Sequence, residues 1–173
     1  MKRIRFTVMC ALESAGTHEK MHRVLSNPYG VLRLSEVENT LGFWVDPQGV
    51  PVMEPGMMAT YEGSVDYAKE FAQRIAQKFN QQYVQLTVQE GEPLTDYQLV
   101  FPIRDTIKHT VLEKLMSAGV RGGTTTNTNL RVNVTESDRL HTYDIIKQVC
   151  KSDGEIKPVS FFSVPAGSLE VTQ

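Results

Sequence analysis

The stretch from Val65 to Val88 constrains the fold most, because it joins an amphipathic helix directly to an alternating strand. Apolar residues recur at every third or fourth position through residues 65–79, and charged or amide side chains fill the positions between them. This is the pattern of a helix with one buried face. Residues 83–88 then alternate between apolar and polar side chains, which indicates a strand. A helix that returns at once to a strand predicts an α/β unit built on a sheet.

The rest of the first half carries shorter strand and helix signals. A run from His18 to Leu25 has apolar residues at helical spacing and indicates a short helix. Pro55 and Gly56 are expected to break the chain between two strands, since both residues interrupt regular structure. The expected strands cover residues 4–12, 31–34, 41–45, 50–52 and 57–61, with a turn over residues 46–49.

The second half shows the same kinds of signal. A helix is expected to begin at a cap formed by Asp105 and to end at Gly119. A hairpin with its turn near Asn127 is expected to follow, and then a second helix that starts near Ser137 and closes at Gly154. The expected strands of this half include residues 97–103, 130–134 and 158–164.

Each half therefore reads as strand, helix, two strands, helix and strand, which is the order of a ferredoxin-like βαββαβ unit. We predict an α/β chain of the α+β type with two such units, residues 1–92 and 93–173, each with an antiparallel or mixed sheet and its helices on one face. The boundary falls in the polar segment 89–96, which glycine and proline interrupt. The bare face of each sheet needs a cover, so we expect the sheets to pack together or the chain to form a homo-oligomer.

Composition excludes several classes of protein. Hydrophobic residues make up 40% of the 173 residues, enough for an ordinary core. Eighteen basic and twenty acidic residues give a net charge of -2, so nucleic-acid binding is disfavoured. No run approaches the roughly 18 apolar residues of a membrane span, and we expect a cytoplasmic protein without a membrane partner. Cys10 and Cys150 stand in apolar surroundings, which predicts two buried, reduced thiols.

One short motif suggests metal chemistry. His18, Glu19 and His22 form an H-E-x-x-H sequence, in which a helix places two imidazoles on one face for zinc and leaves the glutamate as a base. This predicts a metal site at His18 and His22 and, as an alternative function, a metal-dependent hydrolase. Lys20 and Arg23 argue against it, because cations beside the site disfavour zinc binding. The other interpretation is a polar, solvent-facing turn of helix.

A second hydrolase alternative rests on two His-Thr pairs. His109-Thr110 and His141-Thr142 are superficially similar to the H-x-[ST] motifs of two-histidine phosphoesterases. In both pairs the threonine follows at once, and both histidines fall in expected helices rather than strands. The match is therefore incomplete.

A small, polar segment between an expected helix and an expected hairpin is the candidate ligand site. It consists of Arg121, Gly122, Gly123, Thr124, Thr125 and Thr126. Backbone amides and hydroxyls beside a cation can hold a phosphate or a carboxylate, so we predict a small anionic ligand or a nucleotide here. The alternative is a tight connection in which the glycines at positions 119, 122 and 123 only supply positive φ angles.

The sequence from Leu115 to Thr125, LMSAGVRGGTT, resembles the helix-to-strand turn of PII-like signalling proteins. The resemblance implies a ferredoxin-like fold and a trimer. It also implies that adenine nucleotides or other small ligands bind between subunits, here at residues Arg121 to Thr126.

The leading functional prediction is a non-enzymatic binding or regulatory protein that self-associates and holds a small anion near Arg121 to Thr126. The residues name no cofactor and no catalytic group. A hydrolase is the first alternative. The second is a protein-binding inhibitor or adaptor, bacterial or from a phage, that uses an apolar surface around Phe43 and Trp44. Tyr61, Met53, Met57 and Met58 would complete that surface.

Overall fold

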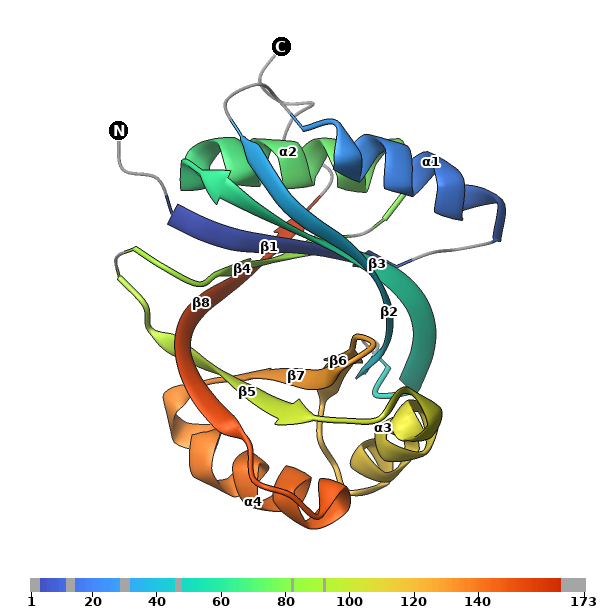
Figure 1. Ribbon diagram of the computed structural model, residues 1–173, viewed down its shortest axis with the longest axis vertical. Coiled ribbons are helices and arrows are strands. Elements are labelled where there is room, and N and C mark those ends of the chain that lie inside the picture. The colour runs from blue at the N-terminus through green and yellow to red at the C-terminus, as the bar shows by residue number, and fades with distance from the viewer. Residues whose placement is uncertain are drawn as a thin grey trace. The chain divides into compact units, whose positions relative to one another are not determined.

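The computed structural model describes residues 4–11, 15–28, 32–45, 48–81, 83–91 and 93–165. These ranges contain the strands β1 (Ile4–Ala11), β2 (Arg33–Val45), β3 (Pro51–Gly63), β4 (Tyr83–Val88), β5 (Asp96–Pro102), β6 (Gly122–Thr125), β7 (Asn129–Val134) and β8 (Glu155–Pro165) (Figure 1). The helices are α1 (Ala15–Ser26), α2 (Val65–Lys78), α3 (Lys108–Ser117) and α4 (Arg139–Cys150), with short 3-10 turns at Asp105–Ile107 and Glu136–Asp138. No helix among the described residues has the length and apolar character needed to cross a membrane.

The strands form one closed series, which corrects the predicted fold class. Their hydrogen-bonded order is β1-β3-β2-β6-β7-β5-β8-β4, a closed barrel, and the described registers are antiparallel. The prediction of two ferredoxin-like α/β units with separate open sheets is therefore wrong. The physical reason is that β2 pairs with β6 and β4 pairs with β8, so strands that would have been exposed sheet edges have neighbours on both sides.

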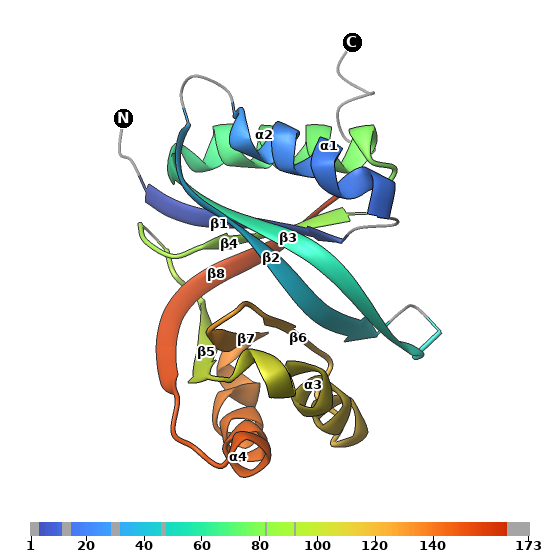
Figure 2. The ribbon, with the colours of Figure 1, turned by 45° about the vertical axis from the view of Figure 1, so that its right-hand side comes forward.

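The chain divides into two compact units. Unit 1 comprises Met1–Glu38, Gly56–Leu94 and Val159–Gln173, and unit 2 comprises Asn39–Pro55 and Thr95–Pro158. The chain passes from one unit to the other inside β2, β3 and β8 (Figure 2). The domain boundary after residue 92 stays a prediction, and residue 92 itself lies outside the described residues.

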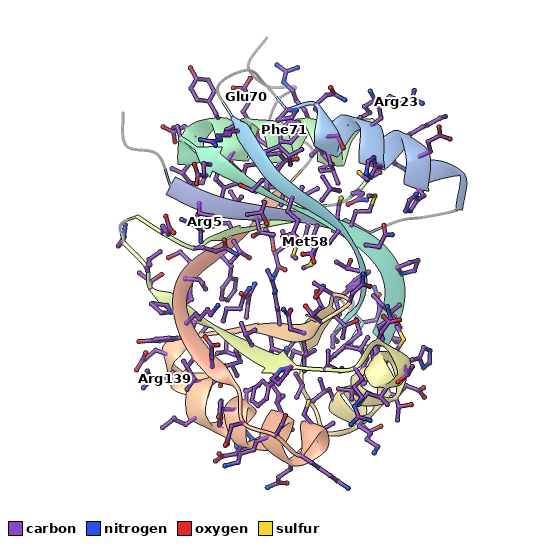
Figure 3. The ribbon with its side chains drawn as sticks, in the orientation of Figure 1. Arg5, Arg23, Met58, Glu70, Phe71 and Arg139 are labelled. Carbon is purple, nitrogen blue, oxygen red and sulfur yellow. The ribbon has the colours of Figure 1, made fainter. Side chains whose placement is uncertain are left out.

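Unit 1 has its hydrophobic core between its sheet and the helices α1 and α2. The helix predicted over residues 65–79 is confirmed as α2, with the Ser64 hydroxyl accepting a hydrogen bond from Asp66 N at 3.3 Å. Tyr61 is fully buried between Phe6 and Phe71, with ring centroids 5.6 Å and 5.5 Å away; Figure 3 shows Phe71 on α2. The Tyr61 hydroxyl donates a 2.6 Å hydrogen bond to the backbone carbonyl of Leu25 and so fastens α1 to the sheet.

Unit 2 has its own core, in which α3 and α4 cover one face of the sheet. Leu99 and Phe101 of β5 and Leu130 and Val132 of β7 are at most 2% exposed and belong to this core. Successive side chains of a strand point to opposite faces. The residues between these four therefore point to the face of the sheet that carries no helix.

Two strands are longer than the sequence predicts. Residues 31–34 and 41–45 were expected as separate strands, but β2 runs without a break from Arg33 to Val45. The break expected at Pro55 and Gly56 is also wrong, because β3 continues through both. Gly56 pairs with Ala11 of β1, and the Pro55 side chain is exposed, so the missing proline donor is tolerated. The first two residues of the turn predicted over residues 46–49 lie outside the described residues.

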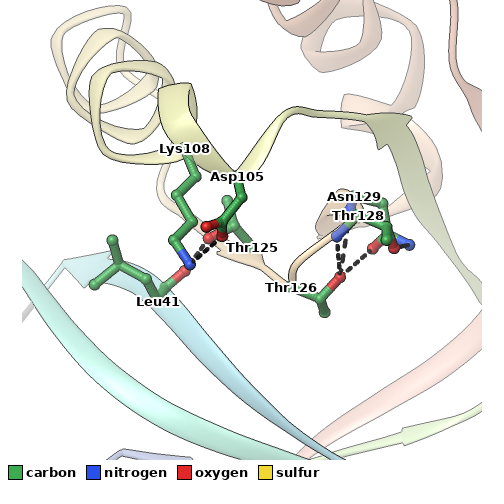
Figure 4. A network of polar contacts seen from close by, with 7 residues as sticks. All are labelled: Leu41, Asp105, Lys108, Thr125, Thr126, Thr128 and Asn129. Atoms are coloured by element: carbon green, nitrogen blue, oxygen red, sulfur yellow. Dashed lines mark hydrogen bonds and ion pairs between the residues drawn. The ribbon is translucent and has the colours of Figure 1, made fainter.

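The first helix of unit 2 also begins differently from the prediction. Asp105, expected as its cap, lies in a 3-10 turn, and α3 starts at Lys108. No side-chain hydrogen bond caps α3. The Asp105 carboxylate instead pairs with the Lys108 ammonium at 2.7 Å (Figure 4), an interaction that still places negative charge at the helix start.

Candidate functional site

The predicted anion-binding segment forms a strand rather than an open loop. Residues 122–125 are β6, Arg121 precedes it with an exposed side chain, and Thr126 follows it. Thr124 lies opposite Gly42 of β2 on one side and opposite Arg131 of β7 on the other. The backbone of β6 is therefore used in sheet pairing on both sides.

Two of the predicted hydroxyls also hold the fold together. Thr125 Oγ1 donates to Leu41 O at 2.8 Å, across to β2. Thr126 Oγ1 donates to Asn129 Oδ1 at 3.2 Å and accepts hydrogen bonds from the backbone amides of Thr128 and Asn129 at 3.3 Å (Figure 4). These contacts close the turn between β6 and β7, where a hairpin was predicted. Both threonines are fully buried.

The three glycines of this region have different roles. Gly119 has a φ of +88° just after α3, which agrees with the predicted helix-ending glycine. Gly122 and Gly123 do not have a positive φ. A Cβ on Gly123 would lie 3.3 Å from both Phe43 Cε1 and Val132 Cγ2, so packing against the core favours glycine at this position.

The helix-free face of the unit 2 sheet gathers polar side chains from several strands, and we call it the polar face. Alternation places Thr124 there, whereas Thr125 points toward the core side. Thr124, a residue of the predicted anion-binding segment, therefore has its side chain on this face. The polar face consists of Thr40, Gly42 and Trp44 of β2, Asp96, Gln98, Val100 and Pro102 of β5, Gly122 and Thr124 of β6, and Asn129, Arg131 and Asn133 of β7.

Hydrogen bonds orient the larger side chains of the polar face. Gln98 is 7% exposed, and its Nε2 donates to Asn133 Oδ1 at 3.0 Å. Arg131 Nε donates to Asn129 Oδ1 at 3.0 Å, which fixes the plane of the guanidinium. The cross-strand neighbours of Arg131, Val100 and Thr124, are uncharged. A half-buried guanidinium set in this way suits a carboxylate or phosphate, which it can bind through two parallel hydrogen bonds.

Sequence reasoning did not identify Gln98, Arg131 and Asn133 as site residues. The alternation of residues 130–134 was visible and predicted a strand, so Arg131 and Asn133 could have been placed on its polar side. Their association with Gln98 depends on the pairing of β5 with β7, which a single sequence does not specify.

The predicted metal ligands lie on α1. The His22 side chain is exposed, with its Nδ1 3.5 Å from Ser26 Oγ, and His18 is half-buried. Glu19, the proposed base, pairs with Arg23 at 3.6 Å. Across the described ranges, no group of three or more His, Cys, Asp or Glu side chains is arranged to hold a metal ion. The site at His18 and His22 stays a prediction.

The histidines of the second hydrolase alternative lie on helices, as expected. His109 is on α3, and its Nδ1 is 2.6 Å from the carboxylate of Glu113 one turn later. His141 is exposed on α4. Neither histidine lies on a strand, which is where the phosphoesterase motif would need both.

Most of the predicted apolar docking surface is buried. Phe43, Met57, Met58 and Tyr61 are at most 3% exposed, and all except Met58 belong to the hydrophobic cores. Met53 packs against the core of unit 2 and is partly buried. Trp44 is half-buried on the polar face.

The two cysteines differ in their surroundings. Cys10 is buried, as predicted, and its Sγ lies 3.4 Å from Met21 Sδ. Burial raises the pKa of the Cys10 thiol from 9.0 to about 12. Cys150 is only partly buried, which corrects the prediction that both thiols are buried, and partial burial raises its pKa as well. Both cysteines are free.

Comparison with known proteins gives no family for this chain. No family model and no curated protein matches it. Its structure is similar to that of the acetolactate synthase small subunit from Thermotoga maritima, with a TM-score of 0.33 and 12% identity over 94% of this chain and 98% of the other. It is also similar to an anthrone oxidase-like protein, with a TM-score of 0.27 and 11% identity over 96% of this chain and 94% of the other.

Proposed function

We propose that this chain is a binding protein for a small organic anion, which Arg131 holds on the polar face of unit 2. The observation that carries the proposal is the setting of Arg131, a half-buried cation whose guanidinium is oriented by Asn129 and whose cross-strand neighbours are uncharged. The proposal keeps the predicted class of ligand and the predicted contact from Thr124. It moves the cationic contact from Arg121 to Arg131.

The physical basis is the strength of a charge-assisted hydrogen bond away from bulk water. Hydrogen bonds to charged groups contribute about 1.5–3 kcal/mol each, and 1.4 kcal/mol is a tenfold change in affinity. Arg121 is exposed, so water screens a contact there much more strongly. Removing the Arg131 charge should therefore weaken anion binding by about 10- to 100-fold.

The composition of the polar face is compatible with ligand binding. Its members are amides, hydroxyls, one guanidinium, the carboxylate of Asp96 and apolar groups. Amides and hydroxyls can orient a ligand through hydrogen bonds. A small ligand is also what the resemblance to PII-like signalling proteins implies. Self-association stays a prediction, which native mass would test.

Thermal unfolding with candidate ligands tests the proposal, because a ligand that binds only the folded state raises the unfolding midpoint. We would measure wild type, Arg131→Gln and the matched control Arg121→Gln with phosphate, acetate, benzoate and adenosine monophosphate. We expect at least one anion to raise the midpoint of the wild type and of Arg121→Gln but not of Arg131→Gln. A shift that disappears only in Arg121→Gln would return the site to the predicted segment, and no shift with any anion would refute the proposal.

A further inference from the structure

Three sulfur-containing side chains come together in the hydrophobic core of unit 1. Cys10 lies on β1, Met21 on α1 and Met57 on β3, and all three belong to the same core cluster. Cys10 is 5% exposed, Met21 1% and Met57 0%. We call these three residues the sulfur cluster. It belongs to unit 1, whereas the polar face belongs to unit 2.

Cys10 is the centre of the sulfur cluster. Its Sγ lies 3.4 Å from Met21 Sδ and 3.7 Å from the backbone oxygen of Met57. Cys10 and Met57 also stand directly opposite each other in the ladder between β1 and β3, which places their Cβ atoms about 4.5–5.5 Å apart on one face of the sheet. A methionine side chain is unbranched and has three rotatable bonds, so the sulfur of Met57 can reach the Cys10 thiol as well.

The distance between the two sulfurs of Cys10 and Met21 is close to that of two ligands on one metal ion. Sulfur ligands lie about 2.3 Å from a metal, so two of them on one trigonal ion are about 4 Å apart. The contact has to lengthen by about half an ångström to admit the ion, which rotation of the methionine side chain can supply. Thiolate and thioether ligands select Cu(I), zinc or iron–sulfur clusters.

Charge and ligand type distinguish these metals. The sulfur cluster has one group that can lose a proton, the Cys10 thiol, and the other described members of the core cluster of unit 1 are uncharged. A Cu(I) ion on one thiolate gives a neutral site, whereas Zn²⁺ leaves a net positive charge in an apolar core, which is costly. An iron–sulfur cluster is normally held by four cysteines. The ligand set therefore favours Cu(I).

We propose that the sulfur cluster binds one Cu(I) ion through Cys10 Sγ, Met21 Sδ and Met57 Sδ. The S–H bond of Cys10 breaks, a bond from sulfur to copper forms, the proton passes to water, and the oxidation state of copper does not change. Because burial raises the pKa of the Cys10 thiol to about 12, the empty site is protonated at neutral pH, and uptake of the ion releases a proton. Local opening of α1, which carries Met21, admits the ion.

Competition with a Cu(I) chelator tests the site. We would titrate the reduced full chain with Cu(I) without oxygen, in the presence of bathocuproine disulfonate, and count the sulfur ligands of the bound copper by X-ray absorption. We expect one Cu(I) ion per chain, three sulfur ligands and the release of one proton per ion at neutral pH. Zinc should not raise the midpoint of thermal unfolding, whereas Cu(I) should.

Three variants locate the ion. Cys10→Ala should abolish tight binding. Met21→Leu keeps the volume of the side chain, a change that cores tolerate, and should weaken binding about tenfold or more and lower the number of sulfur ligands to two. The matched control is Cys150→Ala, which removes the other free thiol and should leave the affinity unchanged. The midpoint of thermal unfolding without metal checks that each variant is folded.

The outcomes decide between this site and its alternatives. If the wild type does not take Cu(I) from the chelator, the proposal is overturned. Binding that is lost in Cys150→Ala and kept in Cys10→Ala would assign the copper to the other thiol. Unchanged affinity and sulfur number in Met21→Leu would exclude the thioether as a ligand, and this variant decides the question even if Cys10→Ala is unstable.

Discussion

Gln98 of β5 and Asn133 of β7 stand opposite each other in the sheet, and Gln98 Nε2 donates a 3.0 Å hydrogen bond to Asn133 Oδ1. Because Gln98 is 7% exposed, the loss of its partner leaves a buried amide unpaired. We expect Asn133→Ala to lower the free energy of unfolding by about 1–3 kcal/mol. The midpoint and slope of urea unfolding measure this change.

The control for this pair is the double variant Gln98→Leu with Asn133→Leu. Replacing both polar partners with apolar groups of similar size removes the unpaired amide together with the hydrogen bond. We expect the double variant to be more stable than Asn133→Ala alone. Equal losses in the two proteins would show that the hydrogen bond does not couple these residues.

The contact between Gly154 and Phe101 predicts a large effect from a single methyl group. A Cβ on Gly154 would lie 2.7 Å from three atoms of the Phe101 ring. That ring is fully buried beside Tyr143, with centroids 5.0 Å apart, and the Tyr143 hydroxyl binds both Gly154 N and Gly154 O. We expect Gly154→Ala to lower the free energy of unfolding by about 1–3 kcal/mol through overpacking, measured by urea unfolding.

The matched control is a second glycine-to-alanine change in the same unit. Gly122→Ala meets no atom closer than 3.4 Å, so it should be nearly neutral. Shortening the ring with Phe101→Leu should reduce the cost of Gly154→Ala, because the two changes share one contact. If the two changes lower the free energy of unfolding additively, the cost of Gly154→Ala does not come from contact with the Phe101 ring.

The end of α4 contains a strained residue. Lys151 has a φ of +55° in the left-handed region, which costs a residue with a Cβ about 1–2 kcal/mol relative to glycine. Lys151→Gly should therefore raise the free energy of unfolding by up to about 1 kcal/mol after the larger entropy of the unfolded glycine is subtracted. The comparison is Gln148→Gly inside α4, which should lower it by about 1 kcal/mol. Thermal unfolding of both variants decides the sign.

The buried thiol of Cys10 predicts how stability depends on pH. Its pKa is raised from 9.0 to about 12, so the folded chain keeps a proton that the unfolded chain loses in this range. The contribution is therefore fully present below about pH 9 and is lost as pH rises toward 12, with a total on the order of 4 kcal/mol. Urea unfolding between pH 8 and pH 11 measures the decline.

Cys10→Ala is the control for the pH dependence. It should flatten the part of the decline that begins near pH 9. A residual decline should remain at higher pH, because burial also raises the pKa of the Tyr61 phenol. An identical pH profile in wild type and Cys10→Ala would contradict the assignment to this thiol.

Local periodicity was enough to predict several elements closely. The strand expected over residues 83–88 is β4 with the same bounds, and the helix expected over residues 65–79 is α2 to within one residue. The buried residues of α2, Ala68, Phe71, Ala72, Ile75 and Ala76, recur at helical spacing, and the sequence of β4 alternates apolar and polar residues. Both signals depend only on neighbouring residues. The middle of β2 has no such signal, because residues 35–40 are mostly polar, and its strand conformation depends on pairing with other strands.

The closed strand order and the polar face depend on contacts that are distant in sequence. The ladder between β2 and β6 joins Leu41 with Thr125, and a single sequence contains no local signal for that pairing. The alternation around Arg131 was visible, but the neighbours that define its setting come from β5 and β6. The segment at residues 121–126 was chosen for its small and polar residues. In the structure most of these residues form a largely buried strand, β6, and the turn that follows it.

Because β2, β3 and β8 each run from one unit into the other, the two units cannot be separated by cutting the gene at one point. Unit 2 is built from two separate stretches of the chain and unit 1 from three, so no single uninterrupted stretch of the gene encodes either unit. A fragment that ends before β5 would leave β4 without its partner β8, and the remainder would leave β6 without β2. Recombination that moves one contiguous segment of this chain would therefore transfer an incomplete sheet, and each unit depends on segments that the other interrupts.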